Sequence, residues 1–177
     1  MSYIFTVTPN PLFALTCAVL GVVSPIALIV ALWRGPLGPG RRVFGLSMCL
    51  VVSGLFSFLL VGSYRVYIEV SPNNLKIDAS PAFTNKVFTP DDVVEAFLTD
   101  LSQDSAYRPT TRAIALGWGA YRVGWYMLSS GEKALILTEQ PLVLCLKMVE
   151  GYYVMMGPSR FDEFLRAFNS TLITVET

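Results

Sequence analysis

Two long uncharged apolar segments constrain this chain more than any other feature of its sequence. They cover residues 12–33 and 43–64, and each has 22 residues without a charged side chain. As α-helices they would each be about 33 Å long, which matches a hydrocarbon core of about 30 Å. A signal peptide explains the first segment poorly, because no basic residue precedes it and a second apolar segment follows at once. We therefore expect two membrane-spanning helices.

Charged residues divide the chain into two parts. Residues 1–64 hold three arginines and no acidic residue, whereas residues 65–177 hold ten Lys and Arg and thirteen Asp and Glu. Nucleic-acid binding needs a clustered basic surface, which neither part provides. We expect a transmembrane helical hairpin at residues 1–64, a folded domain at residues 65–177, and no nucleic-acid partner.

The Gly- and Pro-rich linker at residues 34–42 is short, so the two helices should return antiparallel. Small residues recur along both of them and let apolar helices approach closely in lipid. The candidate helix-packing residues are Gly45, Cys49, Ser53 and Ser57 on the second helix, with Ala14 and Gly21 on the first. These faces could seal the hairpin or dock a further helix. Pro25 should interrupt the first helix.

The hairpin is expected to be an anchor. Neither apolar segment contains Asp, Glu, Lys, Arg or His, the residues that normally mark ion and substrate paths in membranes. Three arginines in loop 34–42 place this loop on the cytoplasmic side of a cell membrane. The C-terminal domain would then be extracytoplasmic, which agrees with the glycosylation triplet that begins at Asn169.

Short stretches of alternating apolar residues predict a β domain. The first lies at residues 65–70 and is followed by a turn at SPNN, and the alternation resumes from Val123 with turn signals between the stretches. This pattern is typical of an antiparallel sandwich or barrel. Residues 93–101 follow a Pro-containing turn, and their pattern fits either a strand or a helix.

A helix is expected at residues 160–172, with Ser159 as its N-cap. Phe161, Phe164, Leu165 and Phe168 fall at i, i+3, i+4 and i+7, so they form one apolar face. Because a helix of this length is marginal alone in water, we expect it to pack over the open end of the β-barrel.

The C-terminal third of the chain resembles a known family. The motif residues are Arg112, Gly117, Tyr121, Gly124, Trp125 and Tyr126, followed by the GEKALIL hairpin and the ending YYVMMGPSRFDEFLRAF. This run resembles the pleckstrin-homology-like (PH-like) domains of bacterial and archaeal membrane proteins. The resemblance implies an α+β fold in which a small antiparallel β-barrel is capped by a C-terminal helix, and it favours a strand at residues 93–99.

The glycines at 117, 119 and 124 lie close together but do not form the GxGxxG pattern of a phosphate loop. Within a curved sheet, glycine allows a bulge or a close crossing of strands that a Cβ would block. We therefore interpret Gly117, Gly119 and Gly124 as structural residues of the barrel.

The sequence offers little support for catalysis or cofactor binding. It contains no histidine, the commonest general base and metal ligand. Cys17 and Cys49 would lie at different depths in the hairpin, and Cys145 lies in an apolar strand. The expected phosphate-binding hairpin, SPNNLK, has one lysine, which argues against phosphoinositide binding. We predict no enzyme activity, no catalytic or metal site, and no cofactor.

The remaining hypothesis is an interaction or scaffold module anchored in the lipid bilayer. Its partners would be other membrane protein subunits or further copies of itself, so it would be an accessory subunit or a homo-oligomer. The alternative is a sensory or regulatory module that recognises a small ligand or peptide at the membrane surface.

Overall fold

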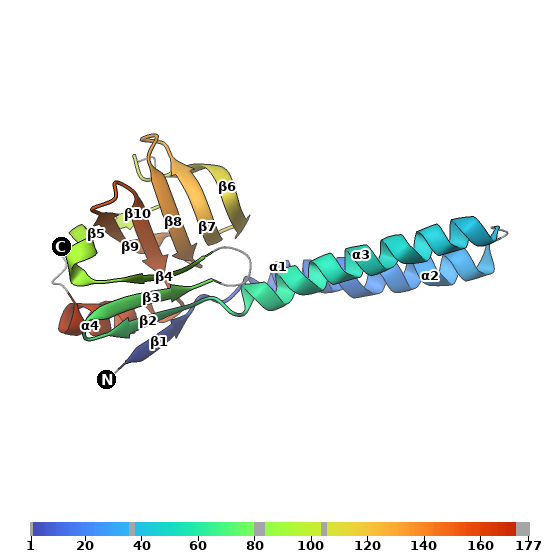
Figure 1. Ribbon diagram of the computed structural model, residues 1–177, viewed down its shortest axis with the longest axis horizontal. Coiled ribbons are helices and arrows are strands. Elements are labelled where there is room, and N and C mark those ends of the chain that lie inside the picture. The colour runs from blue at the N-terminus through green and yellow to red at the C-terminus, as the bar shows by residue number, and fades with distance from the viewer. Residues whose placement is uncertain (1, 36–37, 80–83, 104–105, 173–177) are drawn as a thin grey trace. The chain divides into compact units, whose positions relative to one another are not determined.

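A computed structural model describes residues 2–35, 38–79, 84–103 and 106–172 (Figure 1). The chain divides into a helical unit, Pro11–Ser63, and a strand-rich unit composed of Met1–Asn10 and Tyr64–Thr177. The protein is therefore an α+β protein with two long apolar helices and two β-sheets. The first ten residues group with the strands, whereas the sequence analysis placed them with the hairpin.

The helical unit contains two antiparallel helices that are long and apolar enough to cross a membrane, at Pro11–Arg34 and Pro39–Ser63. The first is built from α1 (Pro11–Ala18), the π-helical segment η1 (Val19–Val23) and α2 (Ser24–Arg34), and the second is α3 (Pro39–Ser63). The interruption expected at Pro25 is this π-helical turn, because proline lacks the N–H that an α-helix needs. Residues 36 and 37 of the expected loop lie outside the described residues.

The strand-rich unit has two sheets. The first has the order β1-β2-β3-β4 and the second has the order β5-β9-β10-β8-β7-β6. The strands of the first sheet are β1 (Tyr3–Thr6), β2 (Tyr67–Ser71), β3 (Asn74–Asp78) and β4 (Asn85–Phe88). Those of the second are β5 (Val93–Asp100), β6 (Pro109–Trp118), β7 (Tyr121–Leu128), β8 (Lys133–Thr138), β9 (Leu142–Met148) and β10 (Tyr153–Gly157).

The expectation of a closed barrel is wrong for the described residues, since no strand of one sheet pairs with a strand of the other. Between the sheets, the chain turns through a short 3-10 helix, η2 (Pro90–Asp92), with Thr89 and Asp92 forming a capping box. The chain then enters β5, which pairs with β9. Residues 93–100 are thus a strand, as the family resemblance favoured.

The expectation that all strands are antiparallel is also wrong, because β10 pairs parallel with β8 and antiparallel with β9. The ends of β8 and β10 are joined by the buried hydroxyl of Thr138, which donates to the carbonyl oxygens of Gln140 at 2.6 Å and Gly157 at 3.3 Å. The short connection through Pro141 thus crosses the end of β10, which lies between β8 and β9 in the sheet. Alternating apolar residues predict that a strand exists but not which strand it pairs with.

The main core lies between the two sheets and under helix α4 (Phe161–Thr171). Ile68 and Ile77 of the first sheet and Leu135 of the second are among its fully buried side chains. The helix lies within one residue of the predicted bounds at each end. Its expected cap is wrong, since Arg160 holds the N-cap position and Ser159 instead donates to the carbonyl of Thr6.

Strand β1 was not anticipated, although it completes the core. It pairs antiparallel with β2, so that Phe5 lies opposite Ile68. The Phe5 ring is buried and meets Phe164 of α4 edge-on, with their ring centroids 5.4 Å apart. A segment before the helical unit and a segment after it therefore build one sheet.

Gly124 is required by the approach of β7 to β6. Its φ of 120° lies in a region that L-residues rarely adopt, and a Cβ there would lie 2.4 Å from the carbonyl oxygen of Ile114. The register of the β6–β7 pair shifts between Arg112 and Ile114, so a bulge lies next to Ala115, the pairing partner of Gly124. Gly117 lies in β6, and Gly119 lies in the turn that follows it.

Candidate functional site

A polar site beside the core is built around Lys86 on edge strand β4. The neighbouring Val87 is 57% exposed and Phe88 is buried, so Lys86 and Phe88 share the inward face of the strand. The lysine therefore extends from the first sheet towards the second.

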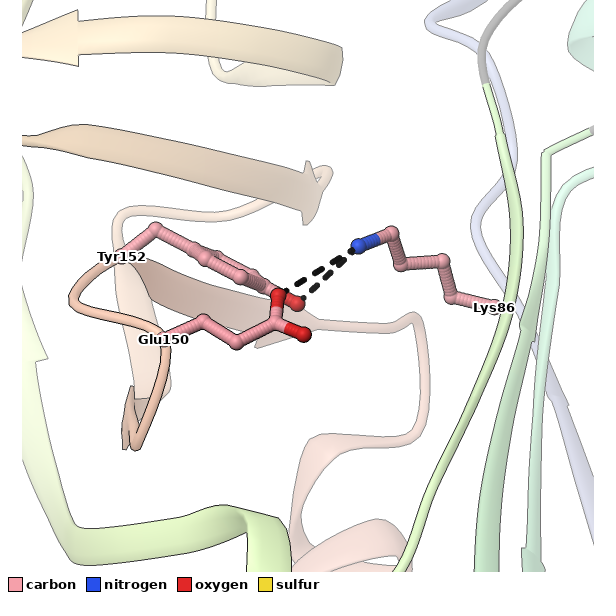
Figure 2. A network of polar contacts seen from close by, with 3 residues as sticks. All are labelled: Lys86, Glu150 and Tyr152. Carbon is pink, nitrogen blue, oxygen red and sulfur yellow. Dashed lines mark hydrogen bonds and ion pairs between the residues drawn. The ribbon is translucent and has the colours of Figure 1, made fainter.

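Two aromatic rings lie against the Lys86 ammonium group, Trp125 of β7 and Tyr152 just before β10. Its Nζ lies 5.6 Å from the ring centroid of Trp125 and 4.9 Å from that of Tyr152, and the two rings are 5.3 Å apart in an edge-on contact. Nζ also donates to the Tyr152 hydroxyl at 3.2 Å and lies 4.0 Å from a carboxylate oxygen of Glu150 (Figure 2). Cation–π and polar contacts thus connect edge strand β4 of the first sheet with residues of the second sheet and of the β9–β10 connection.

A hollow of about 320 Å³ opens beside this lysine. Its wall includes Lys86, Asp92, Glu150 and Tyr152, so it offers one ammonium group, two carboxylates and a phenol. Backbone and side-chain hydrogen bonds from Thr89 lower the pKa of Asp92, which is engaged in the capping box. The hollow therefore lies near the lower end of the size range of small-molecule sites.

A second hollow, the β1–α4 groove, runs between β1 and α4 and has a volume of about 590 Å³. Tyr3 and Ile4 line one side and are 42% and 56% exposed, while Arg160, Glu163 and Arg166 line the other. Arg160 donates to Glu163 at 3.1 Å. The groove therefore combines apolar side chains, both signs of charge and the edge of a sheet.

Cys145 and Tyr153 of the second sheet are both buried, which lowers the reactivity of their side chains. Burial raises the pKa of the Cys145 thiol, so it stays protonated near neutral pH and is a poor nucleophile. Burial, aided by the nearby Glu132, raises the pKa of Tyr153 to about 12. In the part of the chain that the structure describes, no three His, Cys, Asp or Glu side chains gather as metal ligands.

The candidate helix-packing residues mostly face the inside of the hairpin. Gly21 is buried, and a Cβ there would lie 3.0 Å from the Cβ of Phe56 and 3.9 Å from the backbone carbonyl of Ser53. Cys49 is buried, and Gly45, Ser53 and Ala14 are half-buried. Ser57, by contrast, is exposed. The small faces thus pack the two helices together, and Ser57 lies on the outer surface of α3.

The predicted phenylalanine face of α4 lies in the core. Phe161, Phe164 and Phe168 are buried, and Leu165 is half-buried. The sequence analysis did not predict the contact of Lys86 with Trp125 and Tyr152. These residues are far apart in the sequence, so no regular spacing connects them. The sequence analysis also missed β1, for which the available signal was the alternation of Phe5 and Val7 with threonines.

No protein-family model and no curated protein sequence matches this chain. The PH-like resemblance therefore stays a prediction, and the functional argument depends on the geometry described above.

Proposed function

We propose that this protein is a membrane-anchored, PH-like interaction module that serves as an accessory subunit of a membrane complex or as part of a homo-oligomer. The observation that carries the proposal is the pairing of β1 with β2. β1 precedes the helical unit and β2 follows it, so the folded domain holds both ends of the apolar hairpin. A domain joined in this way is fixed to its anchor by two chain connections.

The surface of the helical unit supports insertion into a bilayer. Large apolar side chains point outwards along α3, including Phe44 and Leu50, each 75% exposed. Only 6% of the most apolar stretch of Pro39–Ser63 is buried, which is unlike the core helix of a soluble protein. Exposure of so much apolar surface in water would be costly, whereas lipid accommodates it.

The same pairing supports the proposed topology. With β1 and β2 in one sheet, a two-span hairpin has both of its ends on one side of the membrane, and the arginine-rich loop favours the cytoplasmic side for the loop itself. A cysteine introduced by Ser2→Cys or Ser130→Cys should react with an impermeant maleimide added outside intact cells, and Gly38→Cys should react only after permeabilisation. Labelling of Ser2→Cys and Ser130→Cys from opposite sides would exclude a two-span hairpin.

The interaction role is supported by the surfaces that remain open. β1 is the edge of its sheet beside the β1–α4 groove, and Ser57 leaves a small exposed position on α3. Open strand edges and small residues on apolar helices are the features by which proteins pair in water and in lipid, respectively.

Purification in a mild detergent at native expression level tests the interaction role. We expect the chain to emerge with a stoichiometric companion, either a second copy or another membrane protein, by native mass spectrometry. Ser57→Leu should release a companion helix, whereas Leu55→Ile, at an exposed position, should retain it. A parent protein that is a lone monomer would refute the proposal.

That outcome would instead favour the sensory alternative. The hollow beside Lys86 supports this second candidate, because its ammonium, phenol and carboxylate groups surround a space of small-molecule size. The small ligand would then stabilise the monomer in a thermal-shift screen, and Lys86→Met would remove this shift.

A further inference from the structure

Four strands form the edges of the two sheets, and three of them carry features that discourage pairing with another chain. β4 carries Lys86, and β5 carries Glu95 with a register shift beside it. β6 begins with Pro109 and has two register shifts. Charges, prolines and bulges on edge strands are the usual means of preventing edge-to-edge association.

β1 has none of these features. Its residues Tyr3–Thr6 include no charge and no proline, and its pairing with β2 is continuous. Tyr3 and Ile4 are both large, apolar and exposed. Among the described sheet edges, β1 is thus the one without such features, and it is open to a further strand around Ile4, whereas at Thr6 the edge already contacts Ser159.

The hydrogen-bonding register identifies which groups face this open edge. Val7 N–H donates to the carbonyl of Val66 at 3.1 Å, so the odd-numbered residues of β1 direct their N–H and C=O groups towards β2. The N–H and C=O of Ile4 therefore point away from the sheet. The carbonyl of Thr6, the next outward residue, already accepts from Ser159.

We propose that β1 pairs antiparallel with β1 of a second copy of this chain, about a two-fold axis at Ile4, and so joins two four-stranded sheets. This inference rests on the proposed interaction function and names its partner. At the axis, the two Ile4 residues exchange N–H···O=C bonds, which is the self-complementary contact that a two-fold dimer needs.

The charges beside β1 are also self-complementary. Arg160, Glu163 and Arg166 of α4 line the β1–α4 groove, and Arg166 forms no ion pair with another described residue. In the dimer, we expect Arg166 of each copy to pair with Glu163 of the other. Because both copies are confined to one membrane, their high effective concentration compensates for the shortness of the strand.

Disulfide cross-linking of the full chain in its native membrane tests this pairing. Ile4→Cys should form a disulfide-linked dimer under mild oxidation, since residues opposite each other in such a pair have Cα atoms about 5.5 Å apart. Val87→Cys, on β4 at the other edge of the same sheet and 57% exposed, is the matched control and should stay monomeric. The native cysteines at 17, 49 and 145 are buried and should not contribute.

Ile4→Lys should convert the dimer to a monomer in mild detergent, because two like charges would lie directly opposite each other, whereas Ile4→Val should leave it intact. An unchanged melting temperature of the Ile4→Lys variant would show that the domain is still folded. If this variant does not fold, the Ile4→Cys cross-link decides.

Equal cross-linking at positions 4 and 87, no cross-link at position 4, or a folded Ile4→Lys dimer would overturn the inference. Its failure is distinguishable from failure of the proposed function. A monomer that co-purifies with another membrane protein, or a dimer that ignores position 4, refutes only the β1 pairing. A lone monomer refutes both.

Discussion

Phe164→Ala should lower the free energy of unfolding of the strand-rich unit by about 3–5 kcal/mol. The Phe164 ring is fully buried, and it contacts Phe5 of β1 edge-on and Phe168 of its own helix. Its removal therefore leaves a cavity where β1 and α4 meet. A domain of this size has about 5–15 kcal/mol of stability, so the loss should be visible as a sharply lower melting temperature.

The matched control is Arg166→Ala on the exposed face of the same helix. It changes no buried contact, so its melting temperature should stay close to that of the parent. The measurement is thermal unfolding of the detergent-solubilised chain by near-UV circular dichroism. Equal small effects of both substitutions would mean that α4 is not docked on the core.

Local features of this fold were predictable because their signals are local. The apolar face of α4 follows from a 3.6-residue period, and the turn between β2 and β3 follows from Pro72 in SPNN. The two long helices follow from the uninterrupted apolar stretches, which need no tertiary information.

Pairing partners were not predictable, because they depend on contacts between distant parts of the chain. In the parallel β8–β10 pair, the chain leaves β8, forms β9 one position further along the sheet, and then returns with β10 to fill the space between them. Nothing in the local sequence pattern predicts this order. β1 escaped notice because its partner, β2, follows only after the entire helical unit. Because β1 forms one wall of the β1–α4 groove, an analysis that did not predict β1 could not predict the groove either.

The site around Lys86 illustrates a different limit. Its three partners are Trp125 of β7 and, in the connection between β9 and β10, Glu150 and Tyr152, and each fits an ordinary strand or turn pattern. Lys86 is the one charged residue of a short edge strand. From the sequence alone, such a residue is expected to face the solvent. The contact arises because Lys86 shares the inward face of β4 with Phe88.

Removing β1 should have a still larger effect than removing one phenylalanine. A domain in which a short Gly/Ser linker replaces residues 11–63 keeps β1, because Val7 already lies beside Val66. It should unfold cooperatively, whereas a fragment that begins at Tyr64 should lose most of its cooperative transition, since Phe5 and Val7 leave the core and the edge of β2 is exposed. Losing Phe5 alone is expected to cost about 3–5 kcal/mol, a large part of the total. Within the linked domain, Phe5→Ala should reproduce much of this loss and Ile4→Ala, at an exposed position, should not. Urea unfolding followed by tryptophan fluorescence measures all four proteins, and a Tyr64 fragment as stable as the linked domain would show that β1 is not part of the folded unit.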